Sequence, residues 1–249
     1  MRKLLFVTTL FSILIRLYAQ TDQVLHEEQW GGRFNLHMTE NGEILAVSSI
    51  VFHNDKLYLY DMAERRIVIL DSAGSFIKET ALSSIGRYTY VGDDFVVLNN
   101  NAIFLNTVDK KLEIFELNSG KHKLSVSYPH DYYASESKRS HRIINRIYLD
   151  GEDIVLATGY KLFYFDYKSE KVIQKKKSIS AESGGRFLFY DGTTTVVLSH
   201  ERIVINNNKS VPAVKSRYPI SGKQFFLKNS RLFALSLDSF GFRIIEVND

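Results

Sequence analysis

Short runs of Val, Ile, Leu, Phe and Tyr recur along the whole chain, and clusters of Asn, Asp, Gly and Ser separate them. Within the runs, apolar residues either alternate with polar ones or are continuous. β-branched and aromatic residues favour pleated, half-buried strands, and Asn, Asp and Gly favour tight hairpin turns. The pattern therefore predicts short antiparallel strands joined as meanders, and an all-β fold.

The strands fall into repeats. Residues 53–79 match residues 99–125, both reading turn, strand, polar link, strand, Gly-containing turn, strand. A second, gapless match aligns the segments that begin at Gly92, Gly151 and Gly192. The two matches place Gly92 differently within a repeat, which leaves the repeat boundaries in the first half open. Third strands are predicted at 67–70, 112–117, 162–165, 203–205 and 244–247, so five units are visible.

A repeat of this length indicates small sheets stacked around a ring, because a lone four-stranded sheet cannot cover both of its faces. We predict a β-propeller of five or six small antiparallel four-stranded blades. The last unit stops after its third strand, and residues 24–29 form a strand without a repeat, so pairing of the N- and C-terminal strands should close the ring. Residues 34–47 belong either to an enlarged first blade or to a sixth.

One unit carries a family resemblance. Residues 50–80 contain "LYLYD" (57–61) and "RIVILD" (66–71), and this segment resembles an NHL-type repeat of six-bladed propellers. The other units lose the equivalent of Asp61 and have Thr107 and Leu235 nearby. The resemblance implies propeller architecture. Such propellers are binding scaffolds in most cases and lyases or lactonases in some. The resemblance therefore favours a binding role without assigning a function.

The N-terminus predicts export. Residues 1–20 begin with Arg2 and Lys3, continue with an apolar run shorter than a bilayer-spanning helix needs, and read as a signal peptide; the weaker alternative is a permanent membrane anchor. Removal of the signal peptide leaves residues 21–249 as a single domain. Of the 32 basic residues, three lie in the leader, so 29 remain against 28 acidic ones. This near balance of charge lacks the excess of basic residues that is typical of nucleic-acid-binding proteins. There is no cysteine, so disulfides and thiolate sites are excluded. We expect a bacterial periplasm, cell surface or secreted location, without stable membrane insertion after cleavage.

Two sets of residues are candidate binding sites. The longest interruption of the repeat, residues 130–146, combines aromatic and basic side chains of the kind enriched at binding hot spots; they are Tyr132, Tyr133, Arg139, His141 and Arg142. Its alternative reading is a solvated insertion. A cation also leads each predicted third strand, which would form a belt around the ring; these are Arg66, Lys111, Lys161, Arg202 and Arg243. The alternative is that they blunt the pairing of exposed strand edges.

Carboxylates and amides gather at the predicted turn between the first two strands of each unit, at Asn54–Asp55, Asp93–Asp94, Glu152–Asp153, Asp191 and Asn229. Ring symmetry would bring them to one face, although tight turns need the same residue types. No nucleophile, phosphate-binding or metal-ligand motif is present, so no cofactor or metal is predicted. The leading hypothesis is a non-catalytic scaffold that binds a protein or cell-envelope component. The alternative is a hydrolase or lyase acting on a carbohydrate or lactone-like substrate at the central channel.

Overall fold

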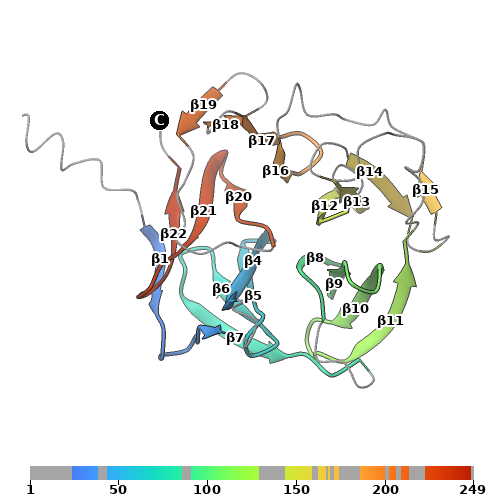
Figure 1. Cartoon of the computed structure of the whole chain (residues 1–249), viewed down its shortest axis with the longest axis horizontal. Helices are drawn as coiled ribbons and strands as arrows, with labels where there is room; N and C mark the ends of the chain where they lie inside the picture. Colours follow the sequence, from blue (N-terminus) through green and yellow to red (C-terminus); the bar gives the residue numbers. More distant parts are fainter. Residues whose placement is uncertain are drawn as a thin grey trace, which may run out of the picture.

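The computed structural model describes residues 24–38, 44–85, 91–128, 144–158, 162–166, 168, 171–173, 186–199, 202–205, 209–212 and 222–247. In this part of the chain, five four-stranded antiparallel sheets are arranged as the blades of a β-propeller (Figure 1). The all-β propeller prediction is confirmed, and the number of blades is five. We name the blades A to E in chain order.

Each blade places its first strand at the centre of the ring and its fourth at the rim (Figure 1). Blade A consists of β4 (Val47–His53), β5 (Lys56–Asp61), β6 (Arg66–Asp71) and β7 (Phe76–Ala81). Blade B consists of β8 (Asp94–Leu98), β9 (Asn101–Asn106), β10 (Lys111–Glu116) and β11 (His122–Ser127). Blade C consists of β12 (Arg146–Asp150), β13 (Asp153–Ala157), β14 (Leu162–Asp166) and β15 (Lys171–Ile173). Blade D consists of β16 (Arg186–Tyr190), β17 (Thr195–Ser199), β18 (Arg202–Ile205) and β19 (Lys209–Pro212).

Blade E closes the ring with both ends of the chain, as the sequence predicts. Its first three strands are β20 (Phe225–Lys228), β21 (Arg231–Leu237) and β22 (Gly241–Glu246), and its outer strand is β1 (Val24–Gln29). β1 pairs antiparallel with β22, and Glu27 lies opposite Arg243. Because the first strand of the chain covers the free edge of the last sheet, the closure removes an edge that could pair with another molecule.

Residues 34–47 do not form a sixth blade. Their described residues, 34–38 and 44–47, include a two-stranded hairpin, β2 (His37–Met38) with β3 (Ile44–Leu45), and β4 begins at Val47. Phe34 is fully buried and packs edge-on against Phe242, with ring centroids 4.8 Å apart. This segment therefore fills the junction between blades E and A, the place where the ring closes.

Asn and Asp set the tight turns between first and second strands. Asn54–Asp55, Asn99–Asn100 and Asn229–Ser230 all have positive φ at both turn residues, which is the backbone of the two-residue hairpin turns that favour Asn and Asp. The repeat that aligns residues 53–79 with 99–125 is thus correct to within one residue. In the gapless match, Gly151 and Gly192 do occupy equivalent turns, but Gly92 precedes the first strand of blade B.

Apolar clusters lie at the interfaces between neighbouring blades. Phe95 and Val97 of β8 pack toward blade A, whereas Val96 and Leu98 pack toward blade C. This alternation follows from the two-residue period of a strand, which sends successive side chains to opposite faces. Each described blade is therefore apolar on both faces, which explains why many of the runs in the sequence are continuous.

The ring has two distinct faces. The inner strands begin on one face, where the outer strands also end and the third strands begin. We call it the loop face. The inner strands end on the other side, which we call the opposite face, at the turns that join first and second strands.

Candidate functional site

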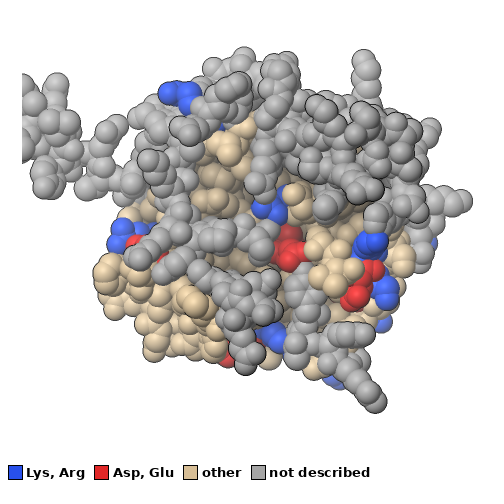
Figure 2. All heavy atoms as spheres, in the orientation of Figure 1, with Lys and Arg blue, Asp and Glu red and all other residues tan. Residues whose placement is uncertain are grey.

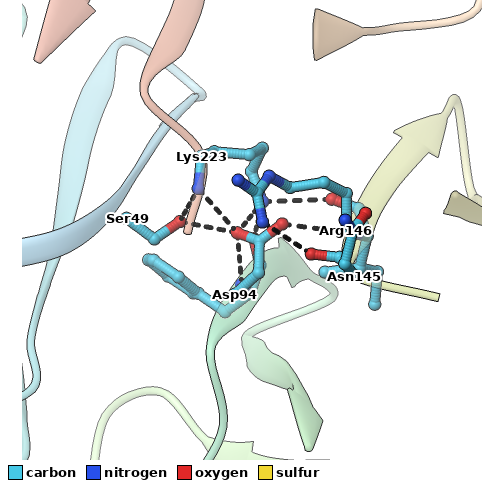
Figure 3. Close-up of polar contacts among 7 residues, drawn as sticks. Ser49, Asp94, Asn145, Arg146 and Lys223 are labelled. Carbon is cyan, nitrogen blue, oxygen red and sulfur yellow. Dashed lines mark hydrogen bonds and ion pairs between the residues drawn. The ribbon is translucent and has the colours of Figure 1, made fainter. Parts of the chain in front are cut away.

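The centre of the ring on the loop face holds a buried cluster of four residues from four blades, shown in Figure 3 for the side chains that it labels. Asp94 begins β8 and is fully buried. Its Oδ1 accepts hydrogen bonds from Ser49 Oγ (2.6 Å), the Phe95 amide (2.9 Å) and Lys223 Nζ (2.7 Å), and its Oδ2 accepts one from the Ile147 amide (3.1 Å). We call Ser49, Asp94, Ile147 and Lys223 the central cluster.

Lys223 precedes the inner strand of blade E and is 4% exposed. Its Nζ donates to Asp94 Oδ1 (2.7 Å), to the Ile147 carbonyl (3.0 Å) and to the Phe95 carbonyl. Three acceptors match the three N–H bonds of an ammonium group. Burial lowers the pKa of Lys223 from its usual value, and the charge of Asp94 opposes that shift.

The backbone around Lys223 is also fixed by blade A. The Lys223 amide donates to Ser49 Oγ (3.1 Å) and to Asp94 Oδ1 (3.2 Å), and the Lys223 carbonyl accepts from the Ile50 amide (3.0 Å). Gly222 lies close to the starts of the inner strands of blades A and B. An added Cβ would come within 2.5 Å of the Ser48 carbonyl oxygen and 2.7 Å of the Asp93 carbonyl oxygen. Only glycine fits there without a shift of backbone.

This arrangement joins the starts of inner strands from blades A, B, C and E. A buried ion pair whose hydrogen bonds are all made specifies one geometry, and losing one partner leaves an uncompensated charge. Asp93 and Arg146, both partly exposed, flank the cluster in sequence. Figure 2 shows basic and acidic atoms close together near the middle of the ring on the face that it draws. The chemistry that the geometry supports here is structural, because both charged groups of the cluster are engaged.

The predicted gathering of turn carboxylates is only partly right. Asn54–Asp55, Glu152–Asp153, Asp191 and Asn229 do lie at turns between first and second strands. Asp93–Asp94 do not, because Asn99–Asn100 form that turn in blade B and Asp94 starts the inner strand. Asp94 therefore lies at the loop face, whereas Asp153 and Asp191 lie at the opposite face.

Asp191 stabilises its own turn. Its Oδ1 accepts hydrogen bonds from the amides of Thr193 (3.0 Å) and Thr194 (2.7 Å) and from Thr193 Oγ1 (2.9 Å). This is the usual role of Asp in a tight turn. Asp153 begins β13 and is exposed.

The residues proposed from the long interruption, Tyr132, Tyr133, Arg139, His141 and Arg142, lie outside the described residues, as does Lys161. The described ends of that connection are Tyr128 and Ile144, which are both buried. The backbone amide of Tyr128 donates to the Lys110 carbonyl (3.3 Å), and the backbone amide of Asn145 donates to the Ala157 carbonyl (2.9 Å). The connection therefore leaves from blade B and returns directly into the central cluster at Ile147.

The four described cations of the proposed belt lie on third strands. Arg66, Lys111 and Arg202 each begin their strand, and Arg243 is the third residue of β22. Arg66 pairs with Asp61 (3.0 Å) and Glu79 (2.7 Å), and Arg243 pairs with Glu27 (2.8 Å).

The equivalent of Asp61 in blade B is Asn106, not Thr107. Asp61 Oδ1 accepts from the Glu64 amide (3.2 Å), and Asn106 Oδ1 accepts in the same way from the Asp109 amide (2.8 Å). In blade E, Asp238 Oδ1 accepts from the amides of Phe240 (2.7 Å) and Gly241 (3.0 Å). The position thus keeps its turn-forming role in blades that lack the sequence match.

The described residues include no group of three or more His, Asp or Glu side chains placed to hold a metal ion. They also include no helix of the length and apolarity needed to span a membrane.

Comparison with known proteins gives likenesses of structure only. No family model and no curated protein sequence matches the chain, so the NHL-type resemblance stays a prediction. Similar solved structures include the glutaminyl cyclase of Myxococcus xanthus (11% identity, TM-score 0.49, covering 90% of this chain and 98% of that one). They also include BamB from Moraxella catarrhalis (13% identity, TM-score 0.36, covering 84% and 78%) and the Neurospora crassa Pan2 WD40 domain (11% identity, TM-score 0.40, covering 77% and 56%). At these identities and TM-scores, no property of the three proteins is carried over to this chain.

Proposed function

We propose that this chain is an exported, non-catalytic binding scaffold that engages a protein or cell-envelope component through its loop face and the connection 130–146. The observation that carries the proposal is the anchoring of that connection. It starts at buried Tyr128 and ends at buried Ile144, three residues before Ile147 donates to Asp94. Loops that carry recognition work best on a rigid frame.

Exposed apolar side chains on the same face support this proposal. Val108, in the turn between the second and third strands of blade B, is 71% exposed, and Phe240, in the equivalent turn of blade E, is 76% exposed. Met38 is 68% exposed, on a hairpin whose neighbour Asn35 donates to Glu64 (2.9 Å) of the corresponding turn in blade A. Apolar side chains at turn tips can fill pockets of a partner.

The alternative function, a hydrolase or lyase at the central channel, would require carboxylates that face one substrate as acid and base. Asp94 is fully buried at the loop face, while Asp153 and Asp191 lie in turns on the opposite face. The geometry therefore supports the binding scaffold better.

The test is a cross-linking pull-down in cells with the tagged, full-length gene product, beside a variant in which residues 132–142 are replaced by a short Gly/Ser linker. We expect a specific partner that is lost with the linker variant while the two proteins melt at similar temperatures. Retention of the same partner by the linker variant, or turnover of a carbohydrate or lactone by the purified protein that Asp191→Asn abolishes, would overturn the proposal.

A further inference from the structure

A cavity of about 190 Å³ occupies the middle of the ring, between the central cluster and the opposite face. All five inner strands line it, and Lys223 is the lining residue closest to the loop face. His53, Gly151 and Asp191, which lie at or just beyond the ends of three inner strands, line it on the other side. The cavity is therefore a pit, closed toward the loop face by the central cluster and bordered by turns of the opposite face.

The wall of the pit is aromatic; the rings that line it are Phe52, Tyr148, Phe189, Tyr190, Phe225 and Phe226. Phe52 stacks on Phe226, with ring centroids 5.8 Å apart and planes 28° apart, and Tyr148 meets Phe189 edge-on at 6.4 Å. Rings held in these arrangements can accept a further ring in an offset or edge-on position, which adds to the gain from burial alone.

One wall is held in place by a chain of hydroxyl groups. The hydroxyl groups of Tyr190 and Tyr164 are 2.9 Å apart, and the Tyr164 hydroxyl donates to Asp150 Oδ2 at 2.5 Å. Tyr190 is 4% exposed. The Tyr190 ring is therefore held in place by a partner outside the pit.

The polar groups that border the pit are few. Burial lowers the pKa of His53 below its usual value and so favours the neutral imidazole, in which one nitrogen donates and the other accepts. Asp191 lies at the rim, held by the amides of its turn. The ammonium group of Lys223 lies 5.8 Å from the Tyr148 ring centroid and is paired with Asp94. An aromatic wall that already faces one cation is poorly suited to a second.

We propose that the pit binds a single neutral aromatic ring that carries one hydrogen-bonding group, of the phenol class, with its polar edge toward His53 and Asp191. The volume is below the ~300–1,000 Å³ of pockets for larger ligands, so one ring is the size that fits. The site lies on the face opposite the proposed partner-binding loop and does not depend on that proposal.

Such a ring could belong to a free small molecule or to a tyrosine side chain of a polypeptide. p-Cresol and N-acetyl-tyrosine amide present the same ring with and without a peptide backbone. Binding of p-cresol alone would assign the pit to free small molecules, and binding of both would assign it to either source.

The experiment is titration of the purified protein with p-cresol, followed by ligand-observed NMR and calorimetry. We expect saturable binding that Phe52→Ala weakens by about fivefold, because one stacking partner is lost. Leu149→Trp, which adds bulk to a half-buried lining residue, should abolish binding. Phe76→Ala is the matched control, because Phe76 is 42% exposed on the outer strand of blade A, away from the pit. The affinity of this variant for p-cresol should equal that of the wild type.

If Leu149→Trp does not fold, His53→Ala at the rim is the second variant to titrate, and it should also weaken p-cresol binding. Absence of saturable binding to the folded wild type, or equal affinity in wild type and the folded pit variants, would overturn the proposal. Tighter binding of benzyltrimethylammonium than of p-cresol would overturn the assignment to a neutral ring.

Discussion

Removing the negative charge of Asp94 should destabilise the whole ring. Asp94→Asn keeps the size of the side chain but leaves the ammonium group of Lys223 buried without a counter-charge. In the structure, Asp94 accepts from Ser49, Ile147, Phe95 and Lys223, and both charged side chains are at most 5% exposed. Loss of one partner of a buried pair costs about 3–5 kcal/mol. For a domain of this size, we expect a fall in Tm of about 10 °C.

The assay is denaturant unfolding at 25 °C and pH 7, followed by circular dichroism. Asp153→Asn is the matched control, because Asp153 is exposed at a turn, and its free energy of unfolding should change by no more than about 0.5 kcal/mol. The double variant Asp94→Asn with Lys223→Met should be more stable than the sum of the two single changes implies, because no buried charge remains.

A loss below about 1 kcal/mol for Asp94→Asn, or strict additivity in the double variant, would refute the role given to the central cluster.

Gly222→Ala should lower the free energy of unfolding by about 2 kcal/mol or more, since its Cβ would meet backbone atoms; Gly32→Ala, whose Cβ has only one ordinary contact at 3.5 Å, should be nearly neutral in the same denaturant assay. Deleting residues 24–29 should uncover the edge of β22 and cause self-association, measured by light scattering and compared with the full-length protein. Burial lowers the folded-state pKa of His26 below the value of 6.5 that it has in the unfolded chain. The contribution of the neutral His26 side chain to the free energy of unfolding is therefore complete above pH 6.5 and is lost as the pH falls through the folded-state pKa. The difference in unfolding free energy between pH 7.5 and pH 5.5 should therefore be smaller in His26→Gln.

Local patterns in the sequence predict most of the fold. Apolar runs locate the third strand of every blade, and the orphan strand at 24–29 predicts the closure with β22. These features depend on neighbouring residues and on chain ends, which a single sequence records directly. The choice between five and six blades could not be made, because Phe34 and its hairpin supply the same short apolar pattern as a blade.

The central cluster depends on contacts between distant residues, which the repeat pattern in the sequence does not predict. Asp94 and Lys223 are 129 residues apart, and the gapless match that aligned Gly92 with Gly151 shifted blade B by one strand and assigned Asp94 to a turn. The local sequence does not separate the two cases, because "GDDFVVL" and "GEDIVLA" have the same form, yet Asp94 begins an inner strand and Asp153 begins a second strand. Lys223 resembles any lysine before a strand, and only the ring geometry reveals its burial.

The most direct test of the account asks which face of the ring meets a partner in cells. A photo-reactive amino acid would replace Val108, 71% exposed on the loop face, and in a second strain Lys56, exposed beside a turn of the opposite face. We expect a specific protein adduct from position 108 that disappears when residues 132–142 are replaced, and no adduct of that size from position 56. The same adduct from position 56 alone would contradict the assignment of partner binding to the loop face.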